Sequence, residues 1–165
     1  MKNTFFKDKY EMPETSNYMK LTEGEHTFRV MSSAIVGYEY FTNENKPVRS
    51  EEPFEETPSI KDGGLVKHFW SFVVYNYQAK KLQILNLTQK TIMEPLKALV
   101  DNPKWGSIFE YDIVITRKGM TKNDTTYSVV PNPKEPVSQE IQDLYDNSNI
   151  NLNALYEGGD PWGGK

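Results

Sequence analysis

Lys67-His-Phe-Trp-Ser-Phe-Val-Val-Tyr-Asn-Tyr77 is the most strand-like stretch of this chain. Aromatic and β-branched residues fill it, and these are the residue types that extended strands favour. After the short Gln78–Lys80 connection, Lys81–Thr88 forms a second apolar run. So few connecting residues between two such runs predict a β-hairpin.

Before this hairpin, the pattern predicts one long strand and a long loop. Glu25–Phe41 reads as the strand, and its length indicates a bend near Ser32–Ser33 or Gly37. Asn43–Gly64 reads as the loop, because several prolines and an acidic run oppose regular structure. A loop of this length is typically functional or disordered.

After the hairpin, the pattern predicts a helix and then a second hairpin. Thr88 can cap a helix over Gln89–Val100, whose apolar residues follow helical spacing although Pro95 interrupts its hydrogen bonding. Tyr111–Arg117 and Thr125–Val130 read as the second hairpin.

Three strands, a helix and two strands follow one another in the order of the oligonucleotide-binding (OB) fold. We therefore expect a mostly β protein with a five-stranded OB barrel and one helix between strands three and four. The barrel domain is expected over residues 21–136, after an N-terminal arm in residues 1–20. Residues 137–165 are expected to form an acidic, flexible tail with a weak helix at Ser138–Tyr145.

The composition argues against several classes of protein. The chain has no cysteine, which excludes disulfides, thiolate metal sites and cysteine nucleophiles. Its two histidines, His26 and His68, do not stand in a metal-ligand spacing, and no common catalytic motif is present. We therefore expect no enzyme activity, no metal and no cofactor. The chain also has no apolar run that indicates a signal peptide or a membrane span.

The charge is distributed unevenly along the chain. Residues 66–130 carry nine Lys or Arg and five acidic residues, whereas residues 131–165 carry two Lys and six acidic residues. A basic body followed by an acidic tail is a pattern that needs an explanation, although a solvated surface can produce it by chance.

Single-stranded nucleic acid requires flat π surfaces for its bases and cations for its phosphates. The strand at residues 67–77 offers both, because its side chains alternate between two faces. We expect one face, with Lys67, Phe69, Ser71, Val73, Tyr75 and Tyr77, to point outward, and Trp70 is the residue most readily assigned to the opposite face. Any one of these aromatic residues could instead pack the barrel core. The candidate contacts to single-stranded nucleic acid are Tyr38, Tyr40, Lys46, Arg49, Lys67, Phe69, Trp70, Tyr75, Tyr77, Lys80, Lys81, Arg117, Lys118 and Lys122.

The acidic tail ends with Asp160, Pro161 and Trp162 close to the C-terminus. Such a tail can occupy the protein's own basic groove until nucleic acid displaces it, or it can offer Trp162 to a partner protein. A disordered tail that only confers solubility is the alternative.

Several segments resemble the replicative single-stranded DNA-binding proteins of tailed bacteriophages. The resemblance covers residues 18–162 and rests on the order and spacing of segments that include Gly24–Val30, Gly37–Phe41, Lys46–Ser50, Lys67–Tyr77, Gln83–Ile92, Asp101–Gly106 and Asn151–Trp162. It implies an OB fold and sequence-tolerant binding of single-stranded DNA without a cofactor. It also implies a role in phage replication, recombination or repair in the cytoplasm of an infected bacterium, and a tail that contacts phage or host replication proteins. The oligomeric state, monomer or dimer, stays open.

Two other functions compete with this one. A protein-interaction or assembly module would use the same aromatic face, but Lys67, Lys80 and Lys81 favour nucleic acid because the cores of protein interfaces are depleted in lysine. A nuclease would need acidic residues that converge on a groove, and Glu110 and Asp112, assigned to the fourth strand, are the only candidates on a strand. Charge balance among lysines is the simpler explanation for these two residues.

Overall fold

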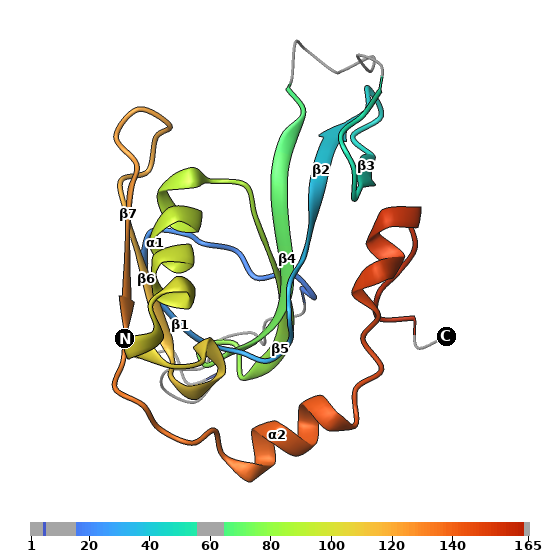
Figure 1. The fold of residues 1–165 in the computed structure, drawn as a ribbon. Helices are drawn as coiled ribbons and strands as arrows, with labels where there is room; N and C mark the ends of the chain where they lie inside the picture. Colours follow the sequence, from blue (N-terminus) through green and yellow to red (C-terminus); the bar gives the residue numbers. More distant parts are fainter. Residues whose placement is uncertain (1–4, 6–15, 56–64, 164–165) are drawn as a thin grey trace.

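The computed structural model describes residues 5, 16–55 and 65–163. Its seven strands form one antiparallel sheet in the order β3-β2-β4-β1-β6-β7, and β5 pairs with the other edge of β4 (Figure 1). The strands are β1 (Gly24–Val30), β2 (Ile35–Phe41), β3 (Pro47–Ser50), β4 (Lys67–Asn76), β5 (Lys81–Leu87), β6 (Ile113–Lys118) and β7 (Thr126–Pro131). The helices are α1 (Lys90–Asp101) and α2 (Gln139–Asp146), with short 3-10 helices η2 (Pro103–Trp105), η3 (Ile108–Glu110) and η4 (Leu152–Glu157). The prediction of a mostly β protein is confirmed.

The expected long first strand is two strands, and the prediction of one continuous strand over Glu25–Phe41 is wrong. β1 and β2 pair with the same edge of β4, which is matched at Val30↔Val74 and again at Ile35↔Ser71. Residues 31–34 therefore bulge out of the ladder, near the predicted bend at Ser32–Ser33. The Ser32 hydroxyl accepts a hydrogen bond from the Val73 amide at 2.9 Å, so the bulge leaves this buried donor satisfied.

The region predicted as a loop contains a strand. β3 (Pro47–Ser50) forms a hairpin with β2, and its turn places Asn45 at φ 62°. Pro47 is tolerated because it is the first residue of an edge strand, where a missing amide costs no ladder hydrogen bond. Residues 56–64 of the predicted loop lie outside the described residues.

The main core lies between the inward faces of the strands and α1. Phe28, Phe72 and Ile113 are buried there together with Ile92 and Leu96 from α1. The predicted helix is confirmed, but the predicted cap is wrong: Gln89 is the N-cap residue and no side chain caps the helix. Burial of the apolar stripe of α1 therefore stabilises the helix in place of a cap.

The sheet is open within the described residues, because β5 and β7 do not pair. The free edge of β5 is covered by the segment Asn17–Met19, with hydrogen bonds from the Met19 amide to the Ile84 carbonyl and from the Ile84 amide to the Asn17 carbonyl, both 2.9 Å. The Met19 side chain is buried in the main core. A short N-terminal segment therefore provides hydrogen-bond partners on the edge of β5 at which another strand would pair in a closed barrel.

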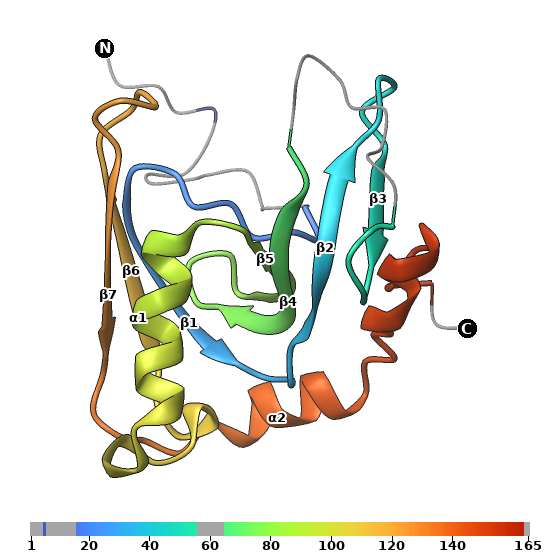
Figure 2. The same ribbon diagram turned by 45° about the horizontal axis from the view of Figure 1, so that its top comes forward.

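The C-terminal segment runs around the sheet. α2 crosses one end of the molecule, and η4 returns beside β3 (Figure 2). The expected helix at Ser138–Tyr145 is confirmed as α2, and the Ser138 hydroxyl accepts a hydrogen bond from the Ile141 amide at its N-terminus. The acidic segment thus returns to the sheet at β3.

Candidate nucleic-acid interface

One part of the sheet extends beyond the main core. We call it the blade and define it as β2, β3 and residues Lys67–Ser71 of β4. Its strands are matched from Ile35↔Ser71 to Glu39↔Lys67 and from Tyr38↔Ser50 to Phe41↔Pro47. Figure 1 shows the blade and the β6–β7 hairpin on opposite sides of the molecule, with both tips at the same end. Because side chains alternate along each strand, the blade has two chemically different faces.

The inner face of the blade carries aromatic side chains that are not fully buried. Trp70 is matched with Val36, and His68 with Tyr38. The rings of Tyr38 and His68 lie 5.2 Å apart at an angle of 55°, and Tyr40 meets Phe54 edge to face at 5.0 Å. Val36 is 44% exposed between the rings. The inner face therefore presents π surfaces in a row, each partly open to solvent.

The outer face of the blade is covered around Phe69. The prediction that the face with Lys67 and Phe69 is open to solvent is wrong at Phe69, whose side chain is 0% exposed. The Arg49 guanidinium lies 5.7 Å from the centre of the Phe69 ring and bonds Glu39 at 3.0 Å. The ring of Tyr156 lies 6.3 Å from the same phenyl ring. An exposed phenyl ring is costly in water, and η4 removes this cost by packing over it.

The end of the acidic tail reaches the same outer face. Pro161 is buried and its carbonyl accepts a hydrogen bond from the Asn151 amide at 2.9 Å, while Trp162 is half-buried. Burial raises the pKa of Tyr18, and the charges of Arg49 and Asp160 act on it in opposite directions. Asp160 therefore lies close enough to Tyr18 to affect the titration of its hydroxyl.

Tyr75 and Tyr77 stand at the other end of β4 from Lys67. Their rings meet edge to face at 5.2 Å. The Tyr77 hydroxyl donates a hydrogen bond to Asp112 at 2.9 Å. Burial is the larger cause, and this hydrogen bond the second, of a rise in the pKa of Tyr77 to about 12. Tyr77 is thus held in a polar network of the fold.

Sequence reasoning missed the centre of that network, Arg29, which is 2% exposed. Its guanidinium donates to Asp112 at 2.7 Å, to the Phe109 carbonyl at 3.0 Å and to the Glu135 carbonyl at 2.7 Å. Asp112, a candidate nuclease residue on sequence grounds, is therefore one half of a structural ion pair. An arginine alternating with the apolar residues of β1 is the only signal of this pair in the sequence.

The predicted cations do not form one patch. Lys46 is exposed in the β2–β3 turn, while Lys118 and Lys122 are exposed in the β6–β7 hairpin, and both tips lie at the same end of the molecule (Figure 1). The Arg117 guanidinium donates to the Leu21 carbonyl at 3.0 Å and so helps to hold the N-terminal segment. Lys80 lies in the β4–β5 turn and Lys81 begins β5, at the far end of β4 from the blade.

Two lysines of α1 were not among the sequence candidates. Lys97 lines the same pocket as Val36 and Trp70, and its side chain is 66% exposed. Lys90 is also exposed and lies two helical turns before Lys97, on the same side of α1. The seven-residue spacing between two lysines in the predicted helix could have revealed this arrangement.

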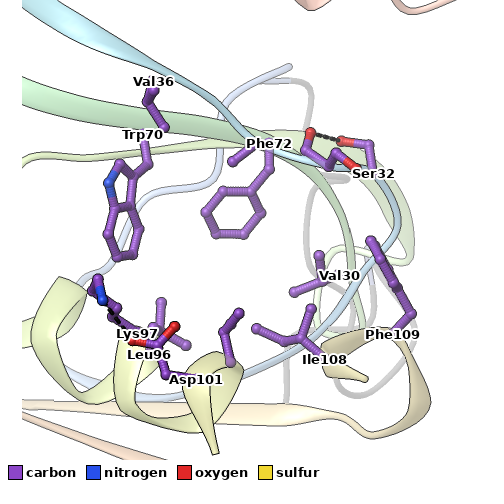
Figure 3. Close-up of a pocket in the computed structure, with 13 residues that line it drawn as sticks. Val30, Ser32, Val36, Trp70, Phe72, Leu96, Lys97, Asp101, Ile108 and Phe109 are labelled. Carbon is purple, nitrogen blue, oxygen red and sulfur yellow. Dashed lines mark hydrogen bonds and ion pairs between the residues drawn. The ribbon is translucent and has the colours of Figure 1, made fainter. Parts of the chain in front are cut away.

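The pocket between the blade and α1 has a volume of about 440 Å³ (Figure 3). Trp70, Phe72 and Val36 line it from the sheet, and Leu96 and Val100 line it from α1. The ion pair of Lys97 and Asp101 lies at its polar side. The cavity therefore adjoins the inner face of the blade at Val36 and Trp70.

Neither a metal centre nor a membrane-spanning helix is found in residues 5, 16–55 and 65–163. In these ranges no three His, Cys, Asp or Glu side chains gather closely enough to hold a metal ion. No helix in the described part of the chain has the length and apolar character needed to cross a bilayer.

No protein-family model, curated protein or solved structure matches this chain. The candidate interface therefore rests on its own geometry: a row of partly open aromatic rings on one side and a lysine-bearing helix on the other.

Proposed function

We propose that this protein binds single-stranded DNA, without sequence preference and without catalysis, on the inner face of the blade. The observation that carries the proposal is the row of partly open rings, Trp70, Tyr38 with His68, and Tyr40 with Phe54. Stacking on such rings accepts every base, because every base has a π face. Lys90 and Lys97 of α1 supply positive charge beside the row for the phosphates.

We also propose that the fold is a variant of the OB barrel. In this variant β5 and β7, the two strands that would close the barrel, do not pair with each other, and another segment pairs with β5. Counting β1 and β2 as one bent strand, the order of strands and helix follows the OB pattern, and β3 is an insertion in the first loop. The antiparallel pairs β1–β4, β4–β5, β1–β6 and β6–β7 support this proposal. The segment Asn17–Met19 takes the position of the missing partner of β5.

The biological role that we propose follows from the resemblance to phage proteins. The protein would coat and protect single-stranded DNA during phage replication, recombination and repair in the cytoplasm of an infected bacterium. Its tail, with Asp160, Pro161 and Trp162, would meet phage or host replication proteins after leaving the outer face.

Tryptophan fluorescence tests the proposed face directly. In a variant that keeps only Trp70 (Trp105→Phe, Trp162→Phe), titration with oligo-dT should quench the tryptophan fluorescence, because a stacked base contacts the indole. The matched control keeps only Trp105, which is 41% exposed on η2, away from the blade, and should stay unchanged.

Anisotropy titrations with labelled oligo-dT, a mixed-sequence single strand and the matching duplex complete the test. We expect similar affinities for the two single strands, weaker duplex binding, and affinities that fall as salt rises. Binding of neither single strand would refute the proposal and favour a protein-interaction module. Single-strand binding that quenches only Trp105 would place the DNA on another surface.

A further inference from the structure

The pocket between the blade and α1 is continuous with the proposed DNA face. Trp70 and Val36 belong to both, because they lie on the inner face of the blade and also line the cavity. A DNA strand whose bases stack along Tyr40 and Tyr38 therefore reaches the mouth of the pocket at the next residue pair on this face, Val36 and Trp70.

The walls of the pocket suit a flat aromatic ligand. Figure 3 shows the indole of Trp70 and the phenyl ring of Phe72 pointing into the cavity from β4, with Phe109 at its far side. Phe109 is 43% exposed although it is a large apolar side chain. The volume of about 440 Å³ lies within the range of about 300–1,000 Å³ that is usual for small-ligand sites.

The polar groups of the pocket are few and lie at its rim. The side chains of Lys97 and Asp101 are more than half exposed, and Ser32 already bonds the Ser33 carbonyl and the Val73 amide. A ligand would therefore find stacking surfaces inside and the ammonium group of Lys97 outside, which a phosphate can contact by replacing the Asp101 carboxylate as its partner. This combination matches a base joined to a phosphate better than it matches an aliphatic side chain.

We propose that the pocket receives one unstacked nucleobase of the bound single strand, with the neighbouring phosphate near Lys97. The proposal rests on the proposed function and adds a discrete subsite to it. The inserted base is expected to be of any type, because stacking on Trp70 and Phe72 accepts every base.

A thermodynamic cycle tests the subsite. In one arm, the double variant Ala34→Leu with Val100→Met fills the pocket with aliphatic groups and adds no π surface. The matched control is Ala98→Leu, because Ala98 is exposed on α1 and does not line the pocket. The other arm replaces one nucleotide at a time by an abasic residue in the shortest oligo-dT that binds with full affinity. Affinities are measured by anisotropy, and circular dichroism confirms that each variant is folded.

We expect one abasic position to weaken binding to the wild-type protein by about tenfold or more. The filled variant should lose a similar factor with the intact oligonucleotide and should be insensitive to that abasic position, so the two losses are not additive. Additive losses, or unchanged binding to the filled variant, would overturn the subsite while leaving the DNA-binding function in place, and a protein side chain would then be the better occupant. No binding of the intact oligonucleotide to the wild-type protein would overturn both proposals.

Discussion

At the scale of single residues, Arg29 shows how the fold holds a buried charge. Its three acceptors are Phe109 of η3, Asp112 just before β6 and Glu135 after β7, so one guanidinium links β1 to two distant segments of the chain. A buried cation is tolerated only where an opposite charge and hydrogen-bond acceptors replace water, and Asp112 and two carbonyls do so here.

Replacing Arg29 by Met should lower the free energy of unfolding by about 3–5 kcal/mol, because Asp112 is left without its partner in a largely buried site. Urea denaturation followed by circular dichroism measures this loss. The control is Lys134→Met, which breaks an exposed pair with Glu110 and should cost far less than the loss of Arg29. Equal losses for the two variants would show that Arg29 is not an anchor of the fold.

Tyr77 gives the fold a dependence on high pH. Its pKa is raised to about 12 in the folded protein, above the ordinary value of about 10. The stability that comes from the neutral hydroxyl is therefore complete below pH 10 and is lost as the pH rises through 12. NMR of tyrosine labelled with ¹³C at Cζ should show one ring that titrates near 12, and Tyr77→Phe should remove it. A highest tyrosine pKa that is the same in both proteins would contradict the assignment.

At the scale of elements, η4 decides which face of the blade is open. It covers Phe69, and the Tyr156 hydroxyl donates to the Val36 carbonyl at 2.6 Å. Leu155 of the same short helix is buried. The C-terminal segment thus acts as an apolar layer on the outer face, while the inner face stays open.

Ending the chain after Asp146 should uncover Phe69 and lower the free energy of unfolding by about 2 kcal/mol or more, as expected for exposing large apolar side chains. DNA affinity should rise modestly at low salt, because acidic residues are removed, and the difference should vanish at high salt. Anisotropy titrations over a salt series measure this. A large gain that persists at high salt and is abolished by Phe69→Ala would instead mean that the tail masks a binding site on the outer face.

The elements also show what can be predicted from this sequence. The hairpins, α1, α2 and the bend at Ser32–Ser33 could be predicted because periodicity and turn residues are local signals. β3 could not, since four residues beginning with proline carry little strand signal. The open face of β4 could not either, because aromatic residues occupy both faces and the segment that covers Phe69 lies more than eighty residues later.

At the scale of the whole molecule, the placement of charge matters more than its sum. The net charge is −4, yet α1 presents Lys90 and Lys97 on one side, while the acidic segment packs on the outer face of the blade. The two lysines can form a phosphate path along α1 when a phosphate replaces Asp101 as the partner of Lys97, although Glu94 and Asp101 on the same side of the helix balance their charge in the free protein.

Neutralising this path should weaken DNA binding and its salt dependence. For Lys90→Gln with Lys97→Gln, we expect the slope of log affinity against log salt to decrease by about 0.7 for each phosphate that the protein no longer neutralises. The matched control is Lys80→Asn with Lys81→Gln at the other end of β4; asparagine suits the positive φ of 55° at residue 80. A larger effect of the control pair would move the phosphate path to the β4–β5 turn.

The segment Asn17–Met19 on β5 has a consequence for how copies of the chain meet. An uncovered strand edge is a template for another strand, and β5 would present one if this segment were detached. A chain that begins after Leu21 would then be prone to exchange strands with its neighbours and to form chains or aggregates, even though every residue of the proposed DNA face is retained. A few residues at the start of the described chain thus close one strand edge to neighbouring copies of the protein.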